Sequence, residues 1–109
     1  MNDKKILKEE TLREIVRRIV EIAQPEKIIL FGSAARGEMN TNSDADFLVI
    51  KRGGFDRSRL TGDIYMGLHG IEQAVDIILV SPEQVERYRD THCLVIHPAL
   101  REGREVYRA

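Results

Sequence analysis

Several features that often place a protein in a class are scarce in this sequence of 109 residues. A single cysteine excludes an internal disulfide and is typical of a protein kept in a reducing compartment. No apolar run approaches the ~20 residues that a membrane-spanning helix requires. The first residues, Met1 to Lys5, are not followed by the apolar segment of a signal peptide. We therefore expect a cytoplasmic protein that does not contact the membrane.

An excess of charge of one sign is also lacking. The chain has 17 basic and 18 acidic side chains, which gives a formal net charge of −1. Because this balance creates no overall basic field, we expect no strong binding of nucleic acid. The remaining composition, 42% hydrophobic and 32% charged, is that of an ordinary globular protein. Its length is enough for one core, so we predict a single domain over residues 1–109.

The hydrophobic pattern predicts helices alternating with strands. Residues 9–24 carry apolar side chains at intervals of three and four, which indicates an amphipathic helix that Pro25 ends. Thr11 and Glu14 could form a capping box, which would start this helix later. The further expected elements are strands at 27–31, 45–51, 74–80 and 105–107, helices at 56–69, 82–90 and from Pro98, and a short helix or extended segment at 91–96.

One stretch combines a turn suited to phosphate with two carboxylates. The apolar run 28–31 predicts a buried strand, and the following Gly32 and Ser33 would turn tightly and offer backbone N–H groups and a hydroxyl to an anion. Asp44 and Asp46 would project from one face of the next strand, because side chains alternate along a strand. Two neighbouring carboxylates repel each other unless a cation holds them. The stretch therefore indicates a divalent metal site beside a phosphate site.

A third acid, Asp76, interrupts the apolar run 74–80. If its strand lies beside that of Asp44 and Asp46, three carboxylates converge and can hold two Mg²⁺ ions. A carboxylate in a buried strand is costly unless it has a partner. Pairing with a buried basic side chain is therefore the alternative explanation for this acid.

Two neighbours of the turn have more than one interpretation. Ser33 could bind phosphate or could cap the short helix expected after it. Arg36, one turn later, could reach phosphate oxygens or could form an ion pair with Glu38. The sequence leaves both alternatives open for Arg36.

The Gly-Ser pair, the ten residues that follow it, the Asp-x-Asp pattern and a later strand with one acid together resemble a known signature. It is that of the DNA polymerase beta superfamily of nucleotidyltransferases. Within it, the chain resembles the minimal nucleotidyltransferases, or MNT proteins, that are commonly encoded beside a HEPN-domain partner. The resemblance implies an α/β (α+β) fold in which helices pack on a small mixed β-sheet, as in the palm of polymerase beta.

The resemblance also implies roles for the site residues. Asp44 and Asp46 would bind both Mg²⁺ ions, whereas Asp76 would bind the ion on the acceptor side and help to take the hydroxyl proton. Gly32 and Ser33 would anchor the triphosphate of ATP. The expected activity is therefore a magnesium-dependent transfer of AMP from ATP to a hydroxyl group.

In the family that the chain resembles, the acceptor is a tyrosine of a HEPN ribonuclease toxin, which the transfer neutralises. We accordingly expect an antitoxin that forms a hetero-oligomer with this partner. One alternative is an antitoxin that blocks its partner by contact alone, without catalysis. Another is an adenylyltransferase acting on a small-molecule hydroxyl, although the chain lacks the carboxy-terminal helical domain typical of such enzymes.

Overall fold

The structure is a computed structural model that describes residues 7–38, 43–89 and 96–109. Each helix and strand expected within these ranges is present, with ends close to the predicted ones, and the stretch 90–95 lies outside the described residues. The elements in chain order are α1 Glu9–Ala23, β1 Lys27–Phe31, α2 Ser33–Arg36, β2 Ala45–Ile50, α3 Arg57–Gly67, β3 Val75–Val80, α4 Pro82–Tyr88, α5 Ile96–Glu102 and β4 Arg104–Arg108.

The described strands form one mixed sheet in the order β3-β2-β1-β4. Strand β1 is antiparallel to both β2 and β4, whereas β2 and β3 are parallel. Parallel neighbours need a crossover connection, and α3 supplies it. The predicted fold class, a small mixed sheet with helices packed on it, is confirmed.

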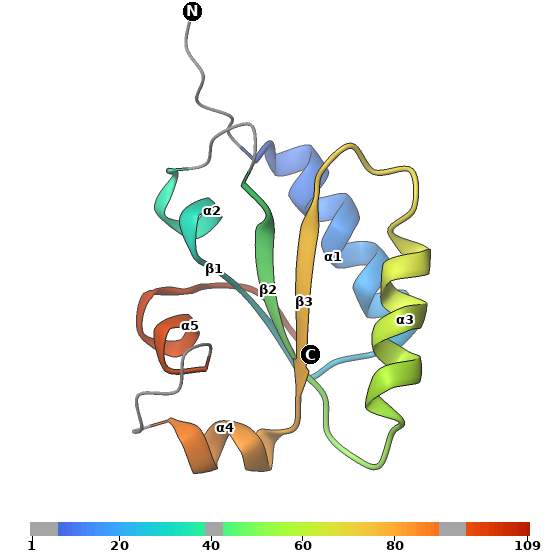
Figure 1. Cartoon of the computed structure of the whole chain (residues 1–109), viewed down its shortest axis with the longest axis vertical. Helices are drawn as coiled ribbons and strands as arrows, with labels where there is room; N and C mark the ends of the chain where they lie inside the picture. Colours follow the sequence, from blue (N-terminus) through green and yellow to red (C-terminus); the bar gives the residue numbers. More distant parts are fainter. Residues whose placement is uncertain (1–6, 39–42, 90–95) are drawn as a thin grey trace, which may run out of the picture.

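Strand β2 is buried on both faces because its side chains alternate between two apolar layers. Ala45, Phe47 and Val49 belong to the layer that also contains the buried side chains of α1 and α3. Leu48 and Ile50 belong to the opposite layer, together with buried side chains of α4 and α5. Figure 1 shows these two pairs of helices on either side of the sheet. The predicted alternation along this strand is therefore confirmed.

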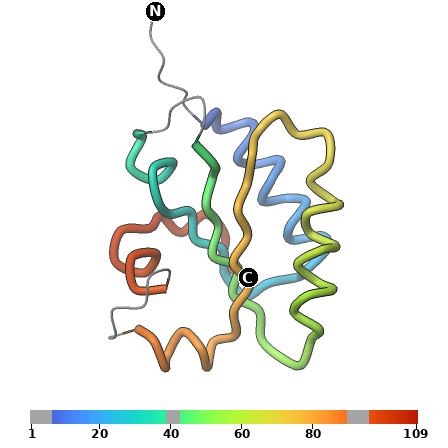
Figure 2. The backbone as a smooth tube through the Cα atoms, in the orientation of Figure 1, coloured from blue at the N-terminus to red at the C-terminus, as the bar shows by residue number. Residues whose placement is uncertain are grey.

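The end of β1 and the beginnings of β2 and β3 lie at the same end of the sheet (Figure 2). This follows from the strand directions, because β1 runs opposite to β2 and β2 runs with β3. Residues that follow β1 are thus brought near the first residues of the other two strands. The three sequence segments that carry the predicted site meet at this end of the sheet.

Helix α1 ends as the sequence predicts but begins differently. Gln24 adopts a left-handed conformation with φ of 48°, and Pro25 follows it. At the other end, Lys8 is the N-cap and makes no side-chain cap hydrogen bond. The predicted capping box of Thr11 and Glu14 is therefore wrong, since both residues lie inside the helix.

Within the described residues, no helix is long and apolar enough to cross a membrane.

Helix α4 begins with the capping box that its sequence predicts. The Ser81 hydroxyl accepts a hydrogen bond from the Gln84 N–H at 3.2 Å, and the Gln84 side chain accepts one from the Ser81 N–H at 3.0 Å. Pro82 occupies the first helical position, where a missing N–H costs nothing. This reciprocal pair fixes the point at which β3 gives way to helix.

Candidate active site

Two of the predicted acids lie directly opposite each other on neighbouring strands. The parallel register of β2 and β3 pairs Asp46 with Asp76. The antiparallel register of β1 and β2 pairs Phe31 with Asp46. The predicted neighbourhood of the two acid-bearing strands is thus confirmed, and the turn that leaves β1 begins beside Asp46.

The electrostatic environment of Asp46 reflects this crowding. Its side chain is half-buried, while Asp44, immediately before β2, is exposed. Burial raises the pKa of Asp46 above its ordinary value, and the negative charges of Asp76 and Asp44 raise it further. The positive charge of Arg36 acts in the opposite direction. The Asp46 carboxylate therefore lies near enough to Asp76 and to Asp44 to be repelled by both.

The acids do not form a closed metal cage. Within the described residues, no three His, Cys, Asp or Glu side chains are grouped so that they could hold a metal ion. Mg²⁺, however, is usually bound through one or two carboxylates, with water and substrate phosphates completing its shell. The carboxylates of Asp46 and Asp76, at one end of the sheet, fit that kind of open site by their chemistry.

Gly32 lies so close to Asp46 that a side chain at this position would displace the Asp46 carboxylate. Its φ is +72°, a value that side chains with a Cβ rarely adopt, and a Cβ placed there would overlap Oδ2 of Asp46. Gly32 is also the N-cap of α2, and Ser33 is the first residue inside that helix. The alternative that Ser33 caps the helix is therefore wrong. The phosphate-binding roles of Gly32 and Ser33 stay predictions.

Arg36 forms ion pairs with two acidic side chains. Its guanidinium lies 3.0 Å from the Glu38 carboxylate and 3.6 Å from that of Glu102 in α5. The predicted pairing with Glu38 is confirmed. A contact between Arg36 and phosphate stays a prediction.

The setting of Asp76 differs from the prediction. It is exposed near the start of β3, which is an edge strand, so the carboxylate is not buried. None of the ion pairs among the described residues involves this acid, and the alternative of a buried basic partner is wrong. Its hydrogen-bond partner is the hydroxyl of Tyr65 in α3, which donates to Oδ1 over 3.3 Å.

Tyr65 was not among the residues singled out by the sequence. Its hydroxyl also accepts a hydrogen bond from the Ile77 N–H at 2.8 Å, and its side chain remains 41% exposed. Burial raises the pKa of Tyr65, and the charges of Asp76 and Asp44 act in the same direction, whereas the Ile77 N–H opposes them. No periodicity marks this residue, because it follows the buried Ile64 on a helix whose apolar side points elsewhere.

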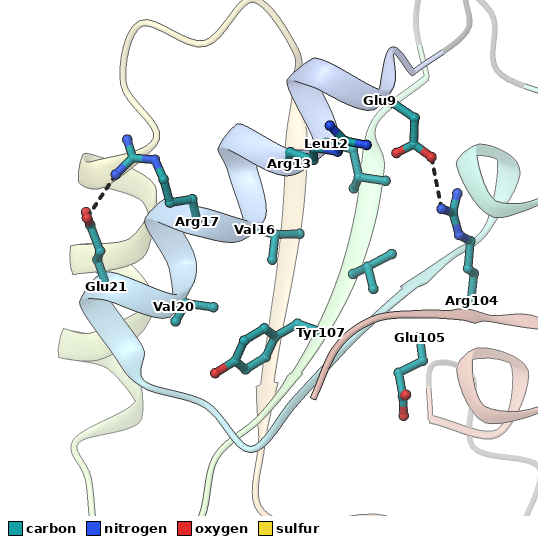
Figure 3. A pocket seen from close by; sticks show the side chains of 11 residues that line it. Glu9, Leu12, Arg13, Val16, Arg17, Val20, Glu21, Arg104, Glu105 and Tyr107 are labelled. Atoms are coloured by element: carbon teal, nitrogen blue, oxygen red, sulfur yellow. Dashed lines mark hydrogen bonds and ion pairs between the residues drawn. The ribbon is translucent and has the colours of Figure 1, made fainter. Parts of the chain in front are cut away.

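A groove of about 530 Å³ lies on another part of the molecule, between α1 and β4 (Figure 3). Ion pairs join Glu9 to Arg104 and Arg17 to Glu21 among its lining residues. The complete lining consists of Glu9, Leu12, Arg13, Val16, Arg17, Val20, Glu21, Arg104, Glu105, Val106 and Tyr107. None of the predicted site residues is among them, so this groove is separate from the acids.

Comparison with known proteins places the chain among nucleotide-transferring domains. The profile of the nucleotidyltransferase domain matches residues 9–106. The chain is 28% identical over 108 residues to the protein adenylyltransferase MntA of Aphanizomenon flos-aquae. This match covers 88% of the chain and 66% of the relative, so the chain spans slightly less than two thirds of the relative's length.

Solved structures share the fold at low sequence identity. A toxin–antitoxin structure with AMP-PNP matches with a TM-score of 0.55 and 23% identity, covering 94% of this chain and 75% of that one. A mutant of the toxin–antitoxin pair MntA–HpeT gives a TM-score of 0.58 and 19% identity, covering 94% and 74%. A Sulfolobus solfataricus protein described as a nucleotidyltransferase gives a TM-score of 0.53 and 17% identity, covering 94% of this chain and 90% of that one. These similarities support the fold alone.

Proposed function

The chain belongs to the nucleotidyltransferase domain family, and on this premise we propose that it transfers AMP from ATP to a hydroxyl group with the help of Mg²⁺. The observation that carries the proposal is that Asp46, Asp76 and Gly32 lie together at one end of the sheet. Carboxylates suited to Mg²⁺ lie there beside the turn at Gly32, which has no side chain to obstruct a phosphate.

The turn after β1 would bind the triphosphate. Gly32 leaves its backbone open to close approach, and Ser33 adds a hydroxyl that can donate to a phosphate oxygen. Arg36 is paired with Glu38 and Glu102 through Nε and Nη1, so its remaining N–H donors could contact a phosphate oxygen. The triphosphate would then lie with its α-phosphorus toward the acids.

The three acids would hold the metal and direct the transfer. Asp44 and Asp46 are the proposed ligands of both ions, and Asp76 is the proposed ligand on the acceptor side. When bound, Mg²⁺ would neutralise phosphate charge and lower the pKa of the acceptor hydroxyl. The acceptor oxygen forms a bond to the α-phosphorus while the bond to the β-phosphate oxygen breaks, and pyrophosphate leaves. The hydroxyl proton would pass to Asp76.

We further propose that the acceptor is a tyrosine of a HEPN ribonuclease toxin, with which the chain would form a complex in the cytoplasm. The name of the relative, a protein adenylyltransferase, supports a protein acceptor. Two solved structures with this fold are described as toxin–antitoxin assemblies, which supports a toxin as the partner. The single cysteine is consistent with a reducing compartment.

The test is transfer of label from ATP labelled at the α-phosphate to a co-expressed HEPN protein. We expect labelling that requires Mg²⁺ and that disappears when the acceptor tyrosine is replaced by phenylalanine. Asp44→Asn and Asp46→Asn should each lower the rate at least about a hundredfold, because a lost ligand removes metal charge from the transition state. Asp63→Asn, at an exposed position of α3, is the matched control and should keep the parent rate.

Activity of either site variant within tenfold of the parent would contradict the metal assignment. Toxin that is neutralised equally well by Asp46→Asn, without label, would identify the alternative of an antitoxin that acts by binding alone. Label found on a small hydroxyl compound rather than on the protein would identify the other alternative.

A further inference from the structure

The hydroxyl of Tyr65 makes two hydrogen bonds, and neither has a role in the transfer proposed above. Its hydroxyl accepts from the Ile77 N–H at 2.8 Å and donates to Oδ1 of Asp76 at 3.3 Å. Both partners are consecutive residues of β3, the edge strand. The tyrosine comes from α3, the crossover helix that connects β2 to β3. One hydroxyl thus links the crossover helix to the strand that carries the third acid.

We propose that Tyr65 is a positioning residue that fixes the carboxylate of Asp76 for metal-dependent transfer. This inference rests on the proposed function, because it concerns an acid of the same site. Tyr65 itself touches neither the nucleotide nor the reacting atoms in this proposal. It acts only through the orientation of Asp76.

The direction of each hydrogen bond follows from the chemistry of a phenol. A hydroxyl has one proton, and because the Ile77 N–H is a donor, the hydroxyl receives that bond through a lone pair. Its proton is therefore free to go to Oδ1 of Asp76. Because this bond uses Oδ1, we propose that the cation is bound through Oδ2 of the same carboxylate.

The need for such an anchor follows from the exposure of Asp76. An exposed carboxylate on an edge strand can rotate, and no ion pair among the described residues restrains it. Tyr65 comes from a helix that is anchored in the core by the fully buried Ile64, and its hydroxyl is held by the Ile77 N–H. The restraint is thus transmitted from the core to a surface ligand. Misplacing such a group by about 1 Å can cost about a hundredfold in rate.

A purely structural role must be distinguished from this one. Tyr65 could serve only to satisfy the Ile77 N–H at the edge of the sheet, in which case its loss would affect stability alone. The distinguishing property is coupling between Tyr65 and Asp76. Positioning predicts that removing the tyrosine hydroxyl matters only while the carboxylate is present.

The experiment is a double-mutant cycle read out by metal binding. Mn²⁺ is titrated into the parent, Tyr65→Phe, Asp76→Asn and the double variant in the presence of a non-hydrolysable ATP analogue, and bound Mn²⁺ is followed by electron paramagnetic resonance. Tyr107→Phe, which removes a phenol from the opposite edge strand β4, is the matched control. Thermal unfolding followed by circular dichroism verifies that every variant is folded at the titration temperature.

We expect Tyr65→Phe to weaken Mn²⁺ binding at least about threefold more in the parent than in the Asp76→Asn background. It should also lower kcat of AMP transfer about tenfold, as the loss of a hydrogen bond to a charged group does, and change KM for ATP less than about twofold. A coupling below threefold overturns the positioning role. If the parent and Tyr107→Phe bind no Mn²⁺ and transfer no AMP, the proposed function itself fails, which is a distinguishable result.

Discussion

At Gly32 the backbone comes so close to the Asp46 carboxylate that a methyl group at this position would force the carboxylate to move. A Cβ at this position would overlap Oδ2 of Asp46, and φ is positive as well. Gly37 also has a positive φ of +70°, but a Cβ there would meet nothing within 4 Å. Both glycines have a positive φ, but their backbones differ: Gly37 lies in the left-handed region with ψ of 25°, whereas Gly32 has ψ of −153°, which is accessible essentially to glycine alone.

Gly37→Ala controls for a positive φ, so the contact between Gly32 and Asp46 is tested through activity rather than through stability. Gly37→Ala should cost about 1–2 kcal/mol of unfolding free energy because of its left-handed backbone, and Gly32→Ala about 1–3 kcal/mol because its backbone conformation is rarer. Only Gly32→Ala should also displace Asp46, and we expect it to lower AMP transfer at least about tenfold below Gly37→Ala. Urea unfolding and initial transfer rates measure the two effects. Equal activity of both variants would show that the turn need not approach Asp46.

Ser33 should tolerate substitution better than its glycine neighbour. Ser33→Ala removes one hydroxyl and keeps the backbone of α2, so it should weaken nucleotide binding by roughly 0.5–3 kcal/mol. Gly32→Val should be worse, because a branched side chain would block phosphate as well as displace Asp46. Calorimetric titration with ATP compares the two variants. A larger loss for Ser33→Ala would reveal a further role of the hydroxyl.

The charge of Asp46 should make the metal-free protein less stable. Its pKa is raised in the folded state by burial and by the charges of Asp76 and Asp44. The folded protein therefore binds more protons than the unfolded chain in the pH range between the unfolded and folded pKa values, and stability falls as pH rises through that range. Below it, where the carboxyl is protonated in both states, the destabilisation is absent.

Asp46→Asn should accordingly raise the melting temperature of the protein in chelator at pH 7. The difference from the parent should shrink as the pH is lowered through the range in which Asp46 takes up its proton. Asp63→Asn, on the exposed side of α3, should change the melting temperature little at any pH. A lower melting temperature for Asp46→Asn in chelator would indicate that this aspartate stabilises the fold.

At the level of elements, most boundaries were predictable because they depend on local chemistry. Pro25 and the left-handed Gln24 end α1, and the pair Ser81 and Gln84 begins α4. These signals act over a few residues and can therefore be read from the chain. The capping box predicted at Thr11 was wrong because α1 extends one turn further, without a side-chain cap.

The features that the sequence did not predict depend on which elements become neighbours. The edge position of β3 leaves Asp76 exposed, although its apolar run suggested a buried strand. Likewise, Tyr65 reaches Asp76 only because α3 crosses over to this edge. The pairing of Asp46 with Asp76 was expected only on condition that their strands are neighbours, and the register meets that condition. Strand order is a tertiary property that no short segment encodes.

The capping box of α4 provides a test at the scale of one element. Ser81→Ala removes the acceptor for the Gln84 N–H and should lower the unfolding free energy by about 1 kcal/mol. Ser58→Ala, inside α3 and exposed, removes a hydroxyl from a helix that Asp56 caps, and should have a smaller effect. Urea denaturation at fixed pH measures both. Equal losses would mean that the cap contributes nothing beyond a surface hydroxyl.

Across the whole molecule, the acids and the groove occupy different parts of the sheet. Asp46 and Asp76 lie on β2 and β3, whereas the groove is formed by α1 and β4, the strand at the opposite edge. In the strand order, β1 separates β4 from the strand of Asp46, and β1 and β2 separate β4 from the strand of Asp76. A ligand in the groove could leave the acids accessible, so the groove does not have to be empty for transfer to occur.

Ligand linkage tests the proposed site through the stability of the entire fold. If Mg²⁺ and ATP bind only the folded chain, a concentration one hundred times Kd should stabilise it by about 2.7 kcal/mol, on the order of 10 °C in melting temperature. Mg²⁺ alone or ATP in chelator should give a smaller rise, because carboxylates and phosphates share the ion. Asp46→Asn should abolish the rise, and Asp63→Asn should retain it. An equal rise in Asp46→Asn would mean that Mg²⁺ and ATP bind without this carboxylate. The absence of any rise in the parent would contradict nucleotide binding by the folded chain.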